Sequence, residues 1–284
     1  MAELTGRTCL VTGATHGIGR ATAEALAAQG ATVIVHGRDS AAVGAVCHEI
    51  ARSAGSGRVT GAVADFASLA AVRKLAAEVA ARHERLDVLV NNAGAGARGR
   101  PVTSDGFEWL FGVNHLAPFL LTNLLLDKLK ASAPARVVVV ASMAYRRAVI
   151  DFDDMNWQRR KYSGLQAYGA SKLANILFTL ELARRLAGSG VTANCLHPGV
   201  VATNIFNKLG LLGRLFTLLA KPWLLTSQEG AKTSIYLASS PEVASVSGKY
   251  YDRGREALLE PPARDAEAAR KLWELSERLC GISR

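Results

Sequence analysis

Short runs of β-branched residues alternate along the chain with longer stretches rich in alanine and leucine. The runs 88–90 and 137–140 are apolar without alternation, which is typical of strands covered on both faces. The pattern predicts strands at 8–12, 32–36, 58–64, 87–91, 136–141, 191–196 and 247–251. It predicts helices at 17–29, 40–54, 67–82, 105–131, 165–187 and 227–239, and a final packing helix at 265–279.

This repetition predicts an α/β fold, namely a doubly wound, Rossmann-type sheet of about seven parallel strands with helices on both faces. No linker rich in Pro, Gly or Ser divides the chain, so we expect one domain over 1–284. Two segments interrupt the rhythm, an insertion at 143–164 and a lid-like segment at 203–226 rich in Leu, Phe and Trp. The second could be a lid over an apolar ligand, a packing element or a membrane-surface contact.

Composition narrows the class of protein. The chain has 284 residues, 49% of them hydrophobic, which is enough for a full core. The first predicted strand begins so early that we expect no secretory or transit peptide, and charges interrupt the apolar run 205–225. We therefore expect a cytoplasmic protein without an integral membrane segment. The four cysteines show no metal or redox spacing, which predicts reduced thiols and no metal site.

The net charge of +10 raises the question of a nucleic-acid partner. Most basic residues are scattered along predicted helices beside acids. One local concentration contains Arg146, Arg147, Arg159, Arg160 and Lys161, but three aspartates lie in the same segment, at 151, 153 and 154. Mixed signs are typical of a solvated loop, so we expect no nucleic-acid partner; an anionic surface bound through this loop remains the alternative.

Three glycines, Gly13, Gly17 and Gly19, fall between the first predicted strand and the first helix. Glycine lets a backbone turn sharply and approach a pyrophosphate, and a helix N-terminus offers unpaired N–H groups. In this strand–turn–helix context the three glycines predict a dinucleotide site.

The end of the second strand bears on the choice of cofactor. Gly37 stands where an acid that binds the adenosine ribose would be expected, and Arg38, whose guanidinium suits a 2′-phosphate, follows it. His16 offers a second cationic contact or is an ordinary turn residue, and Asp39 suits the N-cap of the next helix. The pattern favours NADP over NAD.

Tyr168 and Lys172 lie four residues apart on a predicted helix and therefore share a face. A tyrosine has an unperturbed pKa of about 10, and a nearby ammonium favours the phenolate and lowers that pKa. The pair is thus a candidate proton donor and acceptor.

Together with the glycine turn, this pair resembles the short-chain dehydrogenase/reductase superfamily, and the likeness covers nearly the whole chain. The other matching motifs are Asp65 after strand three, Asn91-Asn92-Ala93-Gly94 after strand four, Asn114, Ser142 at the end of strand five, and the run 198–203. The resemblance implies the catalytic residues Asn114, Ser142, Tyr168 and Lys172. It implies a cofactor site formed by Gly13, Thr15, His16, Gly17, Ile18, Gly19, Arg38, Asp65, Phe66, Asn92, Ala93, Gly94, Tyr168, Lys172, Pro198, Gly199, Val201 and Thr203.

By this resemblance, Ser142 donates a hydrogen bond to the substrate oxygen and Tyr168 exchanges a proton with it. Lys172 lowers the pKa of Tyr168 and binds the nicotinamide ribose, while Asn114 holds a water. Taken singly, each residue has a structural alternative. Asn114 could bridge strand backbones, Ser142 could end a strand, and Asp65 could cap the next helix.

Finer features resemble the retinol dehydrogenase branch and its soluble bacterial relatives. Tyr168 follows Ser142 by 26 residues, and the runs 151–157 and 272–276 match that branch. The resemblance implies NADP(H)-dependent interconversion of a lipophilic ketone or aldehyde and its alcohol, as by a carbonyl reductase or alcohol dehydrogenase. The alternatives are a non-catalytic dinucleotide sensor on this fold and an NAD-dependent alcohol dehydrogenase. Helices 105–131 and 165–187 could form a homodimer or homotetramer interface.

Overall fold

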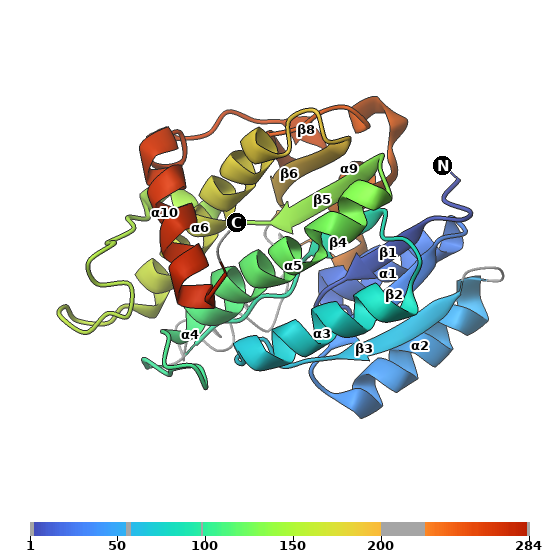
Figure 1. The fold of residues 1–284 in the computed structure, drawn as a ribbon, viewed down its shortest axis with the longest axis horizontal. Helices are drawn as coiled ribbons and strands as arrows, with labels where there is room; N and C mark the ends of the chain where they lie inside the picture. Colours follow the sequence, from blue (N-terminus) through green and yellow to red (C-terminus); the bar gives the residue numbers. More distant parts are fainter. Residues whose placement is uncertain (1–2, 55–57, 98, 200–224, 283–284) are drawn as a thin grey trace.

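Eight strands form one sheet in the order β3-β2-β1-β4-β5-β6-β7-β8 in the computed structural model, which describes residues 3–54, 58–97, 99–199 and 225–282 (Figure 1). The strands are β1 (Thr8–Val11), β2 (Thr32–Gly37), β3 (Val59–Val63), β4 (Val88–Asn91), β5 (Ala135–Val140), β6 (Val191–His197), β7 (Tyr250–Asp252) and β8 (Arg255–Glu256). All neighbours as far as β7 are parallel. The predicted doubly wound sheet is confirmed.

The eighth strand was not predicted. β8 pairs antiparallel with β7 across a tight turn in which Arg253 and Gly254 have φ of 49° and 74°. Two consecutive positive φ values belong to a type I′ hairpin, which matches the strand twist. Both residues of β8 are exposed and charged, so no hydrophobic alternation marks the strand.

Helices cover both faces of the sheet because alternate strand residues point to opposite sides. Leu10, Ile34 and Leu89 join the core under one helical layer, whereas Cys9, Val33 and Val88 join the core under the other. The first layer contains α3 (Leu69–Arg82), α5 (Ala117–Ala131) and α6 (Gly164–Arg185), with α10 (Ala266–Cys280) against α6; the second contains α1 (Gly17–Ala28), α2 (Ser40–Ala54) and α9 (Ser227–Ser239). Short 3₁₀ turns lie at η4 (Pro241–Val243) and η5 (Pro261–Ala263).

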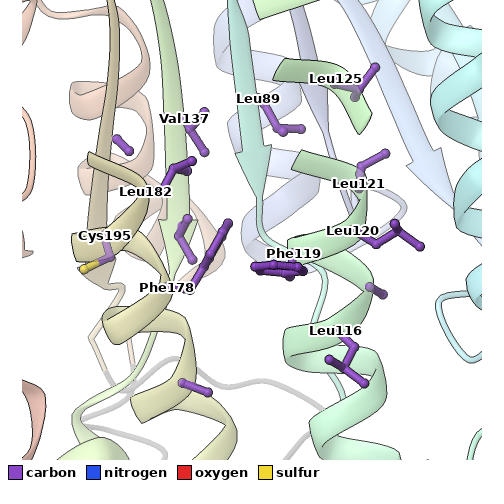
Figure 2. Close-up of a cluster of buried hydrophobic side chains, with 14 of the residues drawn as sticks. Leu89, Leu116, Phe119, Leu120, Leu121, Leu125, Val137, Phe178, Leu182 and Cys195 are labelled. Atoms are coloured by element: carbon purple, nitrogen blue, oxygen red, sulfur yellow. The ribbon is translucent and has the colours of Figure 1, made fainter. Parts of the chain in front are cut away.

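Aromatic rings fill the core between α5, α6 and α10. Phe119 and Phe178 point toward one another from α5 and α6, with ring centroids 5.4 Å apart (Figure 2). Trp273 of α10 completes the cluster, 5.0 Å from Phe119 and 5.9 Å from Phe178. The predicted packing helix is confirmed, and it ends at Gly281 in the left-handed conformation, φ 60°. Part of the α5–α6 face considered for a subunit interface is thus covered by the chain itself.

The helix predicted at 105–131 begins later and is not uniform. It consists of α4 (Trp109–Phe111), the π-helical turn η1 (Gly112–Leu116) and then α5. The carboxylate of Glu108 accepts the N–H groups of Leu110 and Phe111 at 3.0 and 2.8 Å, so Glu108 is the N-cap. Asp105 instead accepts the N–H of Leu69, at the start of α3, at 2.9 Å.

One helical stretch, Trp109–Ala131, is long and apolar enough to cross a membrane by length and composition, but 89% of its apolar window is buried inside the protein. Burial to this degree is typical of a core helix in a water-soluble fold.

The insertion at 143–164 is tied to the start of α4. It opens with a 3₁₀ turn, η2 (Met143–Arg147). The Tyr162 hydroxyl donates to Glu108 at 2.9 Å, and the Glu108 N–H donates to the Asn156 side chain at 2.8 Å. Arg160 lies 3.8 Å over the Trp157 ring and within 3.7 Å of Asp154, so this loop compensates part of its own positive charge. The lid-like segment lies outside the described residues except for its last two positions.

Phe178→Ala should lower the free energy of unfolding by about 3–5 kcal/mol, because it removes a buried ring and leaves a cavity between Phe119 and Trp273. Urea denaturation followed by circular dichroism measures the loss. The control is Leu258→Ala, whose side chain is 84% exposed and whose removal should change stability by less than ~0.5 kcal/mol. Equal stabilities for the two variants would contradict the packing described.

Candidate active site

The predicted site residues gather at one edge of the sheet, where the carboxyl ends of the parallel strands meet. The glycine turn follows β1 and the segment 92–94 follows β4. Ser142 follows β5, and Pro198 and Gly199 follow β6. Val201 and Thr203, the other two residues expected after β6, lie outside the described residues.

The glycine turn and the segment after β4 are in close contact. Gly13 has φ 63°, and a Cβ atom on it would lie 2.8 Å from the Ala93 Cα. A Cβ on Gly19 would lie 2.3 Å from the Asn92 side-chain nitrogen. That nitrogen donates to the carbonyls of Thr12 at 2.8 Å and Gly13 at 3.2 Å. The glycines at 13 and 19 therefore serve this backbone contact.

The third glycine faces open space. Gly17 has φ 60°, and a Cβ atom on it would meet nothing within 4 Å. His16, the N-cap of α1, makes no side-chain hydrogen bond to the first turn of the helix. The side chains of Thr15 and His16 bond to each other at 3.2 Å. An open helix N-terminus beside an unobstructed glycine fits a pyrophosphate group.

The adenosine end of the predicted site carries an exposed arginine, Arg38, just beyond buried β2. A Cβ on Gly37 would lie 2.5 Å from the Thr15 methyl group, so the end of β2 touches the glycine turn. Asp39 accepts the Ala42 N–H at 2.8 Å and caps α2, as predicted.

The segment after β3 borders the same end. Asp65 is exposed and accepts the Ala67 N–H at 2.9 Å, whereas Phe66 is buried. Ser68, not Asp65, is the N-cap of α3. The alternative that Asp65 is the N-cap of the next helix is therefore wrong.

Tyr168 and Lys172 occupy one face of α6, as their spacing predicts. The Lys172 amino group lies 5.7 Å from the centre of the Tyr168 ring and donates to the Val140 carbonyl, at the end of β5, at 3.0 Å. Ser142 follows Val140 by two residues and lies close enough to Tyr168 to lower the pKa of its phenol. Its hydroxyl also accepts the Ala144 N–H at 3.2 Å, which caps η2. Serine, tyrosine and lysine therefore meet at the end of β5.

The Asn114 side chain bridges two segments. Its oxygen accepts the Ala95 N–H at 2.7 Å, and its nitrogen donates to the Ala95 carbonyl at 3.2 Å and the Ser171 hydroxyl at 3.1 Å. Ser171 in turn donates to the Tyr168 carbonyl at 2.8 Å. The alternative that Asn114 bridges strand backbones is not met, because its backbone partner is Ala95, beyond the end of β4, and its other partner is the Ser171 side chain on α6. Sequence reasoning missed Ser171, although it lies inside the Tyr168–Lys172 motif.

Burial acts on both groups of the proton-transfer pair. It raises the pKa of Tyr168, and the smaller effect of the Ser142 hydrogen bond lowers it. Burial also lowers the pKa of Lys172 to about 8. The expected net lowering of the tyrosine pKa is therefore not found in the protein alone, because desolvation penalises the phenolate and the ammonium alike. Near neutral pH Tyr168 keeps its proton and can donate it.

Other sequence predictions concern sulfur and metals. All four cysteines are free; Cys9, Cys195 and Cys280 are buried and Cys47 is half-buried. Within the described ranges, no group of three or more His, Cys, Asp or Glu side chains could hold a metal ion.

Comparison with known proteins identifies the class to which this site belongs. The sheet order, the glycine turn and the Ser142–Tyr168–Lys172 arrangement are the features that define it. The short chain dehydrogenase family model matches residues 7–211. Human retinol dehydrogenase 13 is 48% identical, over 99% of this chain and 86% of that protein. A crystal structure of a Mycobacterium Paratuberculosis protein matches with a TM-score of 0.82 and 36% identity, over 100% of this chain and 96% of the other.

A short chain dehydrogenase from Burkholderia cenocepacia, solved in complex with NADP, matches with a TM-score of 0.71 and 30% identity, over 87% of this chain and 96% of that one. The chain belongs to the short-chain dehydrogenase/reductase family, and within it to the neighbourhood of the retinol dehydrogenases. Its chemistry is hydride-transfer oxidoreduction with a nicotinamide cofactor.

Lys172→Met should raise stability at neutral pH. Folding lowers the lysine pKa from 10.5 to about 8, so burying the charge costs roughly 3 kcal/mol below pH 8, and the cost fades as pH rises toward 10.5. Loss of the hydrogen bond to Val140 offsets about 1 kcal/mol. The variant should therefore be ~1–3 kcal/mol more stable than wild type at pH 7 and lose that advantage by pH 10.5.

Urea unfolding at several pH values measures this difference. Lys130→Met, on an exposed residue of α5, is the control and should show no such pH-dependent gap. A gap that stays constant between pH 7 and pH 10.5 would mean that Lys172 is not desolvated as described.

Proposed function

We propose that the protein is an NADP(H)-dependent oxidoreductase that interconverts a lipophilic ketone or aldehyde and its alcohol. The observation that carries the proposal is the meeting of Ser142, Tyr168 and Lys172 at the sheet edge that also holds the glycine turn. Reduction of a carbonyl group needs a hydride and a proton. The proposed dinucleotide site and Tyr168, at the same edge of the sheet, would supply them.

The cofactor supplies the hydride when it is bound. In this proposal the Ser142 hydroxyl donates to the substrate oxygen, where negative charge develops. Tyr168 gives its proton to that oxygen during reduction, and the raised pKa keeps the proton on the phenol beforehand. Lys172 takes the role of binding the ribose hydroxyls, which its hydrogen bond to Val140 and its closeness to Gly94 support.

Two observations support NADP over NAD. Arg38 is exposed directly after β2, where no acid precedes it. The carboxylate of Asp39, the next residue, caps α2 by accepting the Ala42 N–H at 2.8 Å, so part of its charge is offset by the helix N-terminus. The positive charge of the Arg38 guanidinium then outweighs the negative charge at the end of β2, and a guanidinium can pair with a 2′-phosphate. The Burkholderia cenocepacia relative, which was solved with NADP, agrees.

A lipophilic substrate is favoured by the surroundings of the acid. Met143, beside Ser142, is 40% exposed, and Leu165, one helical turn before Tyr168, is 66% exposed. Large apolar side chains exposed beside a reacting group suit an apolar substrate. The name of the human relative, a retinol dehydrogenase, points to the same chemical class.

Tyr168→Phe should lower kcat for a lipophilic aldehyde by roughly 10²–10⁴-fold, because the variant keeps the ring but has no proton to give. NADPH binding, followed by nicotinamide fluorescence, should change by less than about twofold. Tyr236→Phe removes a hydroxyl on the opposite helical layer and serves as the control. Unchanged turnover in Tyr168→Phe would refute the mechanism, and NADPH binding without turnover in wild type would favour a dinucleotide sensor.

Arg38→Ala should weaken NADPH binding by roughly 10–100-fold, because a charge-assisted hydrogen bond to the 2′-phosphate is lost. NADH lacks that phosphate, so its affinity should be unchanged. Arg52→Ala, the same change of charge in the last turn of α2, is the control. Equal losses for NADPH and NADH would overturn the cofactor assignment.

A further inference from the structure

His36 is a buried polar residue near the end of β2, only 3% exposed. Its ring contacts three other residues. Its Nδ1 accepts the Gly13 N–H at 3.3 Å. Its Nε2 lies 3.1 Å from the Ala64 carbonyl, and its ring stacks on Phe66 with centroids 4.5 Å apart and an angle of 26°. One side chain thus touches the glycine turn and the segment after β3.

The partners define the protonation state of the ring. A backbone N–H can only donate and a carbonyl can only accept, so Nδ1 must be unprotonated and Nε2 must carry the hydrogen. Burial lowers the pKa of His36 to about 4 and maintains this neutral form across the neutral range. The ring therefore acts as a fixed acceptor and donor without charge.

The glycine turn is held from two sides. On one side, the His36 ring accepts the Gly13 N–H and the His36 carbonyl accepts the Ala14 N–H at 2.8 Å. On the other side, the Asn92 side chain donates to the carbonyls of Thr12 and Gly13. Sequence reasoning identified Asn92 but missed its counterpart, because one histidine in an apolar strand carries no signal of its partners.

The second nitrogen reaches the segment proposed to border the adenosine. Ala64, whose carbonyl pairs with Nε2, directly precedes Asp65, and Phe66 supports the ring. The Ala64 N–H donates to the Gly37 carbonyl at 3.1 Å, so backbone and side chain act together. The imidazole therefore sets the separation between the glycine turn and residues 65–66.

We infer that His36 is a positioning residue for the adenosine half of the dinucleotide, acting through Gly13 on one side and Ala64 on the other. This inference rests on the proposed function, since it assumes a dinucleotide in the cradle. If the ring served only to fill space, an apolar side chain would be enough at this position, as it is at the neighbouring core residues Ile34 and Val35. Such a residue would leave the Gly13 N–H and the Ala64 carbonyl without these partners.

The test compares His36→Leu, which fills the volume without polar atoms, with His36→Asn, whose side-chain oxygen can replace Nδ1 as acceptor. His48→Leu, on an exposed residue of α2, is the control. The probes are adenosine 2′,5′-bisphosphate, which represents the adenosine half alone, and reduced nicotinamide mononucleotide, which represents the other half. Binding of each is measured directly, beside kcat and the KM for NADPH.

We expect His36→Leu to weaken adenosine bisphosphate binding and raise the KM for NADPH by about tenfold or more. Nicotinamide mononucleotide binding and kcat at saturating NADPH should stay at the wild-type level, and His36→Asn should recover much of the loss. Unchanged adenosine bisphosphate binding, equal losses for both probes, or no recovery in His36→Asn would overturn the inference.

If His36→Leu does not fold, the ratio of the two affinities in His36→Val, which also removes both ring nitrogens, decides in its place, with His36→Asn again as the variant that restores an acceptor. A selective fall in adenosine bisphosphate affinity supports the inference, and an unchanged ratio refutes it. Failure of the proposed function gives different results. Wild-type protein that turns over no carbonyl substrate would refute the proposed activity and leave the affinity ratio of the two probes to decide on His36, whereas wild-type protein that binds neither NADPH nor NADH would refute the dinucleotide site itself.

Discussion

Lys172 places its amino group in the protein interior and donates it to the carbonyl of Val140, the last residue of β5. This hydrogen bond joins the catalytic helix to the strand that presents Ser142, and it brings Tyr168 against that serine. A buried amine is costly, and its pKa falls because water no longer solvates the ammonium. The buried Lys172 ammonium therefore lowers the stability of the fold while it organises the site. Such a loss of stability at catalytic residues is common in enzymes.

The cofactor edge depends on contacts too close for any side chain. Gly13 approaches Ala93 and Gly19 approaches Asn92, so the turn after β1 and the segment after β4 pack backbone against backbone. Gly17 differs, since a Cβ on it would meet nothing within 4 Å and its φ of 60° is the left-handed conformation that favours glycine. Glycine is thus needed for close backbone packing at positions 13 and 19, and for a left-handed backbone conformation without steric contacts at position 17.

The sheet, most helix bounds and the grouping of Ser142, Tyr168 and Lys172 could be predicted because they rest on local periodicity and on known motifs. The late start of the helix after residue 105 could not, because it depends on a contact distant in sequence: Asp105 accepts the Leu69 N–H at the start of α3, and Glu108 caps the helix that begins at Trp109. Strand β8 depends on a turn and not on apolar residues. The raised tyrosine pKa depends on burial, which spacing along one helix does not reveal.

Helix α10 follows every other described element in the chain, yet Trp273 completes the aromatic core between α5 and α6. During synthesis, the sheet and those two helices leave the ribosome first. If those elements fold before α10 is made, Phe119 and Phe178 lack the Trp273 ring that covers them, and His115 of the π-helical turn lacks its hydrogen bond to Ser276 at 2.9 Å. A chain that lacks α10 would then expose this aromatic surface, and exposed apolar surface of that kind is what makes partly folded chains prone to aggregate.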